Sequence, residues 1–143
     1  MPRVTTRIRV PFADVDSSQR IHFTAMFRYF EIAEHALMRS LGFPYATTLQ
    51  ESAFPRVHLA CDFHAAITYD MLLDVEASVD RVGSSSWTIA YTVRRAPDDT
   101  AALPGAAAGA VVASGRMTIV AMNPTTERSQ PIPDDLRRAL TRD

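Results

Sequence analysis

Residues 24–42, TAMFRYFEIAEHALMRSLG, carry the only long helical pattern of the chain. The apolar side chains of its main stripe recur at spacings of four and three: Met26, Phe30, Ala33, Leu37 and Leu41. Thr24 is a suitable N-cap, Gly42 is a suitable C-terminal cap, and Pro44 prevents the helix from continuing. Because further aromatic and aliphatic side chains lie outside the stripe, we expect the helix to be covered on more than one side.

On both sides of the helix the apolar pattern changes to a period of two, which is typical of half-buried strands. The predicted strands span residues 4–12, 57–67, 71–80, 87–94 and about 111–122. The sequence also predicts a turn at 83–85, a mobile loop at 96–109 and a short terminal helix from Pro133. The order is a strand, the long helix, four strands in antiparallel succession and a helical tail. One helix cannot cover both faces of such a sheet, so we expect a homodimer or homotetramer.

The length and composition predict one globular domain, residues 1–143. The formal net charge of −1 indicates neither a nucleic-acid partner nor a membrane surface. The single cysteine, Cys61, cannot form an intrachain disulfide and is expected to be an inert core residue. No apolar run approaches the roughly 20 residues that span a bilayer, and the N-terminus has no apolar signal region. These features predict a soluble, cytoplasmic protein.

The segment before and within the predicted helix carries a motif. VPFADVD at 10–16 is followed by IHF at 21–23 and by FRYFE at 27–31. This succession of an aromatic residue, an acidic residue, an aspartate, a short loop and an aromatic-rich helix start resembles the N-terminal signature of 4-hydroxybenzoyl-CoA thioesterase-like proteins. The resemblance continues in later segments and covers nearly the whole chain: 54–74, 83–87, 120–123 and 131–136.

The resemblance implies a fold and an activity. The fold is the α+β hot dog, an antiparallel five-stranded sheet wrapped around one long helix. The implied enzyme is a hydrolase of acyl thioesters of coenzyme A or of an acyl carrier protein, with its active site at a dimer interface. Members of the family need no metal or redox cofactor, and coenzyme A enters only as part of the substrate.

Asp16 matches the catalytic aspartate of the family. Its carboxylate would attack the thioester carbonyl as a nucleophile or deprotonate a water molecule as a general base, and the sequence leaves both open. The resemblance assigns the oxyanion hole to the backbone N–H seven residues later, that of Phe23, at the helix N-terminus. His22, Phe27 and Ser86 are candidate substrate contacts. His22 is equally compatible with a surface position at the helix start. Aromatic residues of the helix such as Phe27 are mostly core residues, and small residues such as Ser86 are common in turns before a strand.

Two positions depart from the family pattern. Many relatives have Gly three residues after the aspartate, where this chain has Gln19, so the loop can differ in shape. One branch has a catalytic His at the position of Phe23. Here His22 lies one residue earlier, which rotates a helical side chain by about 100°, so the role of that His is not transferred.

Two other functions stay open from the sequence. A catalytically silent acyl-binding protein would share the fold. A hot-dog dehydratase would need an Asp and a His separated by four residues, whereas five separate Asp16 from His22. Asp14 is expected to order the loop. No metal site is expected, because His58 and His64 lie about 20 Å apart along a strand.

Overall fold

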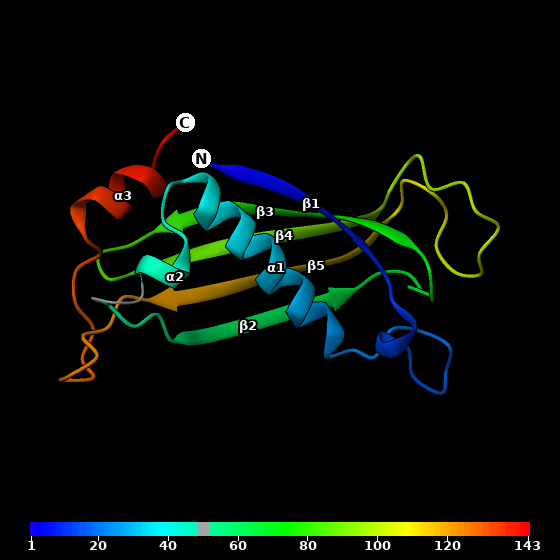
Figure 1. The fold of residues 1–143 in the computed structure, drawn as a ribbon, viewed down its shortest axis with the longest axis horizontal. Coiled ribbons are helices and arrows are strands. Elements are labelled where there is room, and N and C mark those ends of the chain that lie inside the picture. The colour runs from blue at the N-terminus through cyan, green and yellow to red at the C-terminus, as the bar shows by residue number, and fades with distance from the viewer. Residues whose placement is uncertain (49–51) are drawn as a thin grey trace.

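The computed structural model describes residues 1–48 and 52–143. Five strands form one antiparallel sheet in the order β1-β3-β4-β5-β2, and Figure 1 shows the long helix α1 lying across one face of it. The strands are β1 (Arg3–Arg9), β2 (Arg56–Phe63), β3 (Leu72–Val82), β4 (Ser86–Arg95) and β5 (Val111–Val120). The helices are the 3-10 helix η1 (Phe12–Asp14), α1 (Ala25–Ser40), α2 (Tyr45–Thr48) and α3 (Asp134–Leu140). None of these described helices is long and apolar enough to cross a membrane.

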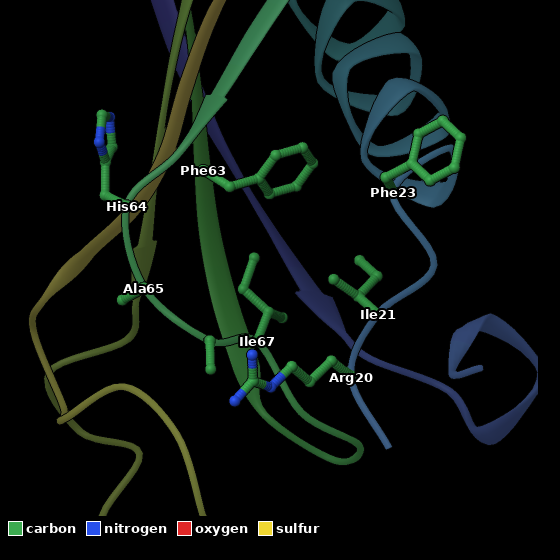
Figure 2. Close-up of a pocket in the computed structure, with 8 residues that line it drawn as sticks. Arg20, Ile21, Phe23, Phe63, His64, Ala65 and Ile67 are labelled. Atoms are coloured by element: carbon green, nitrogen blue, oxygen red, sulfur yellow. The ribbon is translucent and has the colours of Figure 1, made fainter. Parts of the chain in front are cut away.

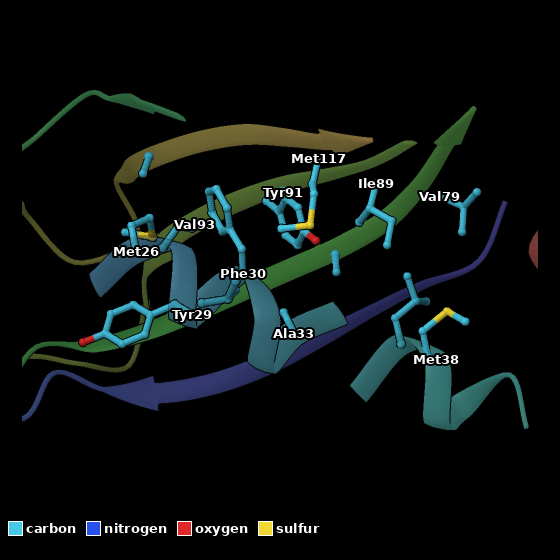
Figure 3. Close-up of a cluster of buried hydrophobic side chains, with 14 of the residues drawn as sticks. Met26, Tyr29, Phe30, Ala33, Met38, Val79, Ile89, Tyr91, Val93 and Met117 are labelled. Atoms are coloured by element: carbon cyan, nitrogen blue, oxygen red, sulfur yellow. The ribbon is translucent and has the colours of Figure 1, made fainter. Parts of the chain in front are cut away.

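The predicted α+β hot-dog architecture is confirmed, and α1 packs its apolar stripe against the inner face of the sheet. Met26, Phe30, Ala33 and Leu37 have no exposed surface. The ring of Phe30 stacks on that of Tyr91 in β4, with 4.2 Å between the centroids (Figure 3). Burial of a large apolar side chain is worth about 1.5–3 kcal/mol. Packing against the sheet, more than helix propensity, therefore holds α1 in place.

Gly115 of β5 leaves room for α1 at this contact. A Cβ atom at position 115 would lie 2.4 Å from the Ala60 carbonyl oxygen and 2.6 Å from the Phe30 ring. Both distances are far below van der Waals contact. A side chain here would therefore displace either the helix or the edge strand β2.

The second strand ends earlier than the sequence pattern predicts. β2 stops at Phe63, and its predicted continuation to Ile67 is wrong. Residues 64–68 turn towards the loop that follows η1, where the Ile21 N–H donates to the Ile67 carbonyl at 2.9 Å. The apolar alternation of the sequence extends to Ile67 because this side chain is still buried in the core, at 1% exposure. Its backbone, however, pairs with the loop that carries Asp16 instead of with β5.

β2 is an edge strand that exposes apolar side chains along its length. Val57, Leu59 and Phe63 expose 62%, 40% and 45% of their surface. The opposite edge, β1, carries three arginines in its seven residues, and charge of this kind discourages pairing with another sheet. The apolar edge, β2, is therefore the one suited to pairing with another strand.

Candidate active site

Asp16 lies in a tight turn between η1 and α1. The Gln19 N–H donates to the Asp16 carbonyl at 2.9 Å, and the Asp16 N–H donates to the Arg20 carbonyl at 3.0 Å. The exposed carboxylate accepts hydrogen bonds from both the hydroxyl and the N–H of Ser18. These bonds, the one from the hydroxyl foremost, lower the pKa of Asp16. The turn thus presents an ionised carboxylate in a defined orientation.

Gln19 closes this turn in a conformation that favours glycine. Its φ is +65°, in the left-handed region, although it is not a glycine. L-residues with a side chain adopt this region at a cost. The loop therefore has the left-handed residue that a glycine would supply, even though this chain has Gln19 there.

Asp14 ties the same loop to α1. Its carboxylate is 6% exposed, accepts a 2.7 Å hydrogen bond from the Tyr29 hydroxyl and forms an ion pair with Arg28. Burial alone would raise the pKa of Asp14, but the hydrogen bonds from Arg28 and Tyr29 and the Arg28 charge together lower it. The Asp14 carbonyl also accepts the His22 N–H at 2.7 Å. The expectation that Asp14 orders the loop is confirmed.

The start of α1 presents the N–H predicted to stabilise an oxyanion. Within the described part of the chain, no group accepts a hydrogen bond from the Phe23 N–H. It lies two residues before the first residue of α1, where the helix dipole is positive. The Phe23 side chain is 62% exposed. The hydrogen-bonding capacity of this N–H is therefore unused by the described residues.

His22 caps the helix start. Its Nδ1 lies 2.7 Å from the Thr24 hydroxyl and accepts the Thr24 N–H at 3.3 Å, and its ring stacks on that of Phe23. Thr24 occupies the predicted N-cap position, but its own side chain makes no capping hydrogen bond to a backbone N–H. The expected hydroxyl cap is therefore absent: the His22 ring binds Thr24 itself, and the N–H groups of Ala25 and Phe27 donate to the carbonyls of His22 and Thr24. The His22 ring stays exposed beside Phe23.

Two pockets open beside the Asp16 turn. The Asp16 pocket, of about 560 Å³, is mainly apolar and is lined by Phe12, Val15, Asp16, Ser17, Gln19, Thr68, Tyr69, Leu103 and Pro104. The Phe23 pocket, of about 390 Å³, is lined by Arg20, Ile21, Phe23, Phe63, His64, Ala65, Ala66 and Ile67. Figure 2 shows the Phe63 ring, from the end of β2, pointing towards the segment that carries Ile21 and Phe23.

Within one chain, Asp16 and Phe23 line different pockets. The two residues belong to one short segment, residues 16–23, whose turn is closed by the hydrogen bond from the Asp16 N–H to Arg20. Arg20 itself lines the Phe23 pocket. The two predicted catalytic groups are thus on neighbouring surfaces of one segment and line two different pockets.

The other two predicted substrate contacts, Phe27 and Ser86, line neither of these two pockets. Phe27 is half-buried and packs against the core, with its ring 6.2 Å from that of Phe30. Ser86 is the first residue of β4, whereas the loop that lines the Asp16 pocket follows Arg95 at the other end of that strand. Nine residue steps in a strand span about 30 Å. Ser86 is therefore remote from Asp16 within one chain.

Glu34 is a buried carboxylate that the sequence analysis did not single out. It has no exposed surface, accepts a 2.6 Å hydrogen bond from the Tyr45 hydroxyl and pairs with Arg56 at 2.8 Å. Burial raises the pKa of Glu34, and the Arg56 charge and the Tyr45 hydroxyl oppose that rise. The sequence contained a signal for its burial, because Glu34 follows Phe30 by four residues and thus lies on the apolar stripe of the helix.

Arg95 and Asp99 form a second buried pair that was not singled out. Their side chains are 4% and 6% exposed, and Nε of Arg95 lies 3.0 Å from Oδ2 of Asp99. The hydrogen bond from Arg95 is the main cause of the lowered pKa of Asp99. The pair stands at the start of the loop that lines the Asp16 pocket. No local pattern marked it, since charged residues in a loop are usually solvated.

The histidines of β2 and its end do not gather with other metal ligands. Nε2 of His64 lies 2.8 Å from the Ser114 hydroxyl of β5, and His58 lies near the other end of the strand. Across residues 1–48 and 52–143, no three His, Cys, Asp or Glu side chains come together as a metal site would require.

Comparison with known families assigns the chain to one of them. Residues 19–102, more than half of the chain, match the model of the thioesterase superfamily. A protein of Aquifex aeolicus (strain VF5) named "Putative esterase" is 30% identical over 95 residues, which cover 65% of this chain and 73% of that protein.

Solved structures share the fold over almost its whole length. A 1,4-dihydroxy-2-naphthoyl-CoA thioesterase from Synechocystis has a TM-score of 0.83 at 17% identity and covers 96% of this chain and 95% of its own. A gentisyl-coenzyme A thioesterase has a TM-score of 0.81 at 22% identity, with 96% and 100% covered. These likenesses show the common fold. Together with the family match, they identify the chain as a hot-dog enzyme that belongs to the thioesterase superfamily.

Proposed function

We propose that this enzyme hydrolyses acyl thioesters of coenzyme A or of an acyl carrier protein, with Asp16 as the reacting carboxylate. The observation that carries the proposal is the setting of Asp16. Its exposed carboxylate is held by Ser18 and lines an apolar pocket of about 560 Å³. Pockets of this size accommodate small organic groups. Two thioesterases of the same fold are named for CoA esters, dihydroxynaphthoyl-CoA and gentisyl-CoA, which supports coenzyme A as the carrier.

The Asp16 carboxylate has two routes to the same products. As a nucleophile, its oxygen bonds to the carbonyl carbon, the C–S bond breaks and the thiolate leaves; water then hydrolyses the mixed anhydride. As a general base, it takes a proton from a water molecule whose oxygen attacks the carbonyl, and the proton passes on to the departing thiolate. Either route consumes one water molecule and yields a carboxylic acid and a thiol.

The Phe23 N–H is proposed as the donor to the developing oxyanion. Its lack of an acceptor among the described residues and its place at the positive end of α1 support this role. One such backbone donor contributes about 3 kcal/mol of transition-state stabilisation. Because the donor is a backbone group, the aromatic side chain at position 23 is free to contact the substrate.

A second copy of the chain is proposed to complete the site. Asp16 and Phe23 line separate pockets within one chain, so a substrate that contacts both needs a surface that closes over residues 16–23. The Phe23 pocket reaches Phe63 on the exposed apolar edge β2. Pairing of β2 with β2 of another copy would bring a partner strand beside this pocket. We propose a homodimer through β2, with a homotetramer of two such dimers as the larger assembly.

The remaining predicted contacts fit this assembly in different ways. The exposed His22 ring, stacked on Phe23, is proposed to contact the substrate at the helix start. Phe27, which packs one side against the core, would contribute through the part of its ring that stays exposed. Ser86 lies too far from Asp16 in the same chain, so only Ser86 of another copy could reach the substrate.

A panel of acyl thioesters tests the proposal. Acetyl-, octanoyl- and benzoyl-CoA and an acyl carrier protein ester are incubated with the enzyme and a thiol-detecting reagent. We expect thiol release from at least one substrate, and loss of that release in Asp16→Asn. A catalytically silent acyl-binding protein would bind the same compounds in calorimetry but release no thiol, and that result would overturn the proposal.

A further inference from the structure

The loop between β4 and β5, residues 96–110, is anchored by the buried side chain of Arg95. The Arg95 guanidinium donates to the carbonyl of Ala101 at 2.7 Å and to that of Ala106 at 2.8 Å. It also binds Asp99, whose carboxylate accepts the Leu72 N–H at 2.9 Å. Arg95 is 4% exposed, so water competes little for these bonds. The loop at 96–109, which the sequence predicts to be mobile, is therefore anchored by the buried pair Arg95 and Asp99.

Further contacts fix the segment between the two carbonyls that Arg95 binds. The Thr68 hydroxyl donates to the Pro104 carbonyl at 2.7 Å, and the Ala106 N–H donates to the Ala66 carbonyl at 3.0 Å. Gly105 has a φ of +101°, and a Cβ atom there would lie 2.7 Å from the Ala66 carbonyl oxygen. The loop thus packs tightly against the turn that follows β2.

Leu103 and Pro104 are the part of this clamped segment that lines the Asp16 pocket. The same pocket is lined by Phe12 and Tyr69, whose rings meet edge to face with 5.5 Å between centroids. These two rings are 75% and 48% exposed, so they offer apolar surface to a ligand. An acyl group whose carbonyl is at Asp16 would therefore extend among two aromatic rings and the Leu103–Pro104 segment.

We infer that Leu103 and Pro104 determine which acyl groups the enzyme prefers, by contacting the distal apolar end of a bulky acyl chain or ring. Arg95 is the positioning residue that holds these two side chains at the pocket. The inference rests on the proposed thioester hydrolysis at Asp16. It adds that acyl preference is set by the β4–β5 loop of the same chain that carries the reacting carboxylate.

Leu103→Ala tests this inference by the ratio of kcat/KM for benzoyl-CoA to that for acetyl-CoA. Loss of apolar contact in a pocket changes discrimination by about 10- to 200-fold, and Leu103 is only half-buried, so we expect the ratio to fall by about tenfold. Ile32→Ala truncates an apolar side chain on α1 that is 46% exposed and lines neither pocket. It should leave the ratio within twofold of the wild-type value. An unchanged ratio in Leu103→Ala would overturn the inference while the proposed hydrolysis stands.

Arg95→Met tests the positioning role with the same two substrates. We expect the benzoyl/acetyl ratio to fall as it does in Leu103→Ala, with the loss for benzoyl-CoA in KM more than in kcat. Arg95→Lys should restore part of the ratio. If Arg95→Met lowers kcat/KM for both substrates by the same factor, Arg95 acts only on folding and the positioning role is wrong.

A binding measurement separates this inference from the proposed hydrolysis. 2-Naphthoate is titrated into the wild-type, Leu103→Ala and Ile32→Ala proteins to measure its Kd by calorimetry, and the methyl signals of Leu103 are followed by NMR in the wild type. We expect these signals to shift and the Kd to rise about fivefold in Leu103→Ala, with no rise in Ile32→Ala. Absence of binding, or equal affinity in all three proteins, would overturn the inference. Binding without thiol release from any substrate would overturn only the hydrolysis.

Discussion

The phenol of Tyr29 in α1 donates a 2.7 Å hydrogen bond to the buried carboxylate of Asp14, two residues before Asp16. The backbone carbonyl of Asp14 accepts the N–H of His22 at the start of the same helix. Asp14 therefore connects the turn that presents the carboxylate with the helix end that presents the Phe23 N–H. Its effect on the reaction is through the position of these groups, because its own oxygens are already bound.

Asp16→Asn keeps the size of the side chain but removes its charge and basicity. Turnover should fall at least roughly a hundredfold, which is the lower end of what one acid–base group supplies. KM should change little, because the carboxylate acts mainly in the transition state. Steady-state kinetics on the best acyl thioester measure both constants. Asp14→Asn is the matched control, with a smaller loss of turnover and lower stability. A fully active Asp16→Asn beside an inactive Asp14→Asn would shift the motif assignment by two residues.

Ser18→Ala should move the acid limb of the pH profile. Its hydroxyl, and then its N–H, hold the pKa of Asp16 below the ordinary value of 3.8. In the proposed reaction Asp16 acts as the carboxylate, so activity should be present above this lowered pKa and be lost as the pH falls through it. Without the hydroxyl the pKa rises, and the acid limb of kcat/KM should move to higher pH. Ser17→Ala, one residue away, should leave the acid limb at its wild-type pH. An acid limb at the same pH in the wild type and in Ser18→Ala would contradict the role of Asp16 as the reacting carboxylate.

Gln19→Gly should stabilise the protein. The left-handed φ of +65° costs a residue with a side chain about 1 kcal/mol or more, and glycine adopts it freely. The greater freedom of glycine in the unfolded chain offsets part of the gain, so the free energy of unfolding in urea should rise by about 0.5 kcal/mol. Ser17→Gly, at a residue without positive φ, should lower it by a similar amount. A destabilised Gln19→Gly would mean that the Gln19 side chain makes a compensating interaction.

Glu34→Gln should change how stability depends on pH. Burial raises the pKa of Glu34 in the folded state above its ordinary value of 4.5. At a pH between the ordinary pKa and the raised pKa, Glu34 of the folded protein keeps a proton that the unfolded chain has lost. The contribution of Glu34 to the free energy of unfolding therefore falls as the pH rises. Glutamine has no such proton. The wild-type free energy of unfolding minus that of Glu34→Gln should therefore decline with pH in urea unfolding from pH 4 to 8.

The same replacement at the exposed Glu127, which is not among the groups that shift the Glu34 pKa, supplies the control for this measurement. The decline with pH measured for Glu34→Gln should exceed the one measured for Glu127→Gln. A wild-type advantage over Glu34→Gln that grows with pH would show that Arg56 and Tyr45 outweigh burial.

Leu59→Asp should weaken the dimer. Leu59 is 40% exposed on the apolar edge β2, and a charge on an edge strand opposes pairing with another strand. Light scattering at micromolar concentration should show a dimer or larger assembly for the wild type and a monomer for the variant. Ile32→Asp, on α1, should keep the dimer. A monomeric wild type would contradict the proposed assembly and the shared site.

The local pattern of the sequence determined the element order and the position of the polar turn that carries Asp16. The stripe from Met26 to Leu41 predicts α1, and the alternation on both sides predicts the strands, because both signals come from neighbours within a few residues. The resemblance of residues 10–16 to the thioesterase signature singled out Asp16, which lines a pocket in the structure, beside Asp14, which orders the loop.

Only the tertiary structure decided which distant groups meet. It paired buried Glu34 with Arg56 and ended β2 at Phe63. It also bound Arg95 to the carbonyls of Ala101 and Ala106, on either side of Leu103 and Pro104. Each of these results depends on contacts between residues far apart in the chain, whose geometry no local period encodes. The same is true of the separation of Asp16 and Phe23 into two pockets. Seven residues of sequence place both groups at one helix start, but the fold of the turn between them decides which surface each group faces.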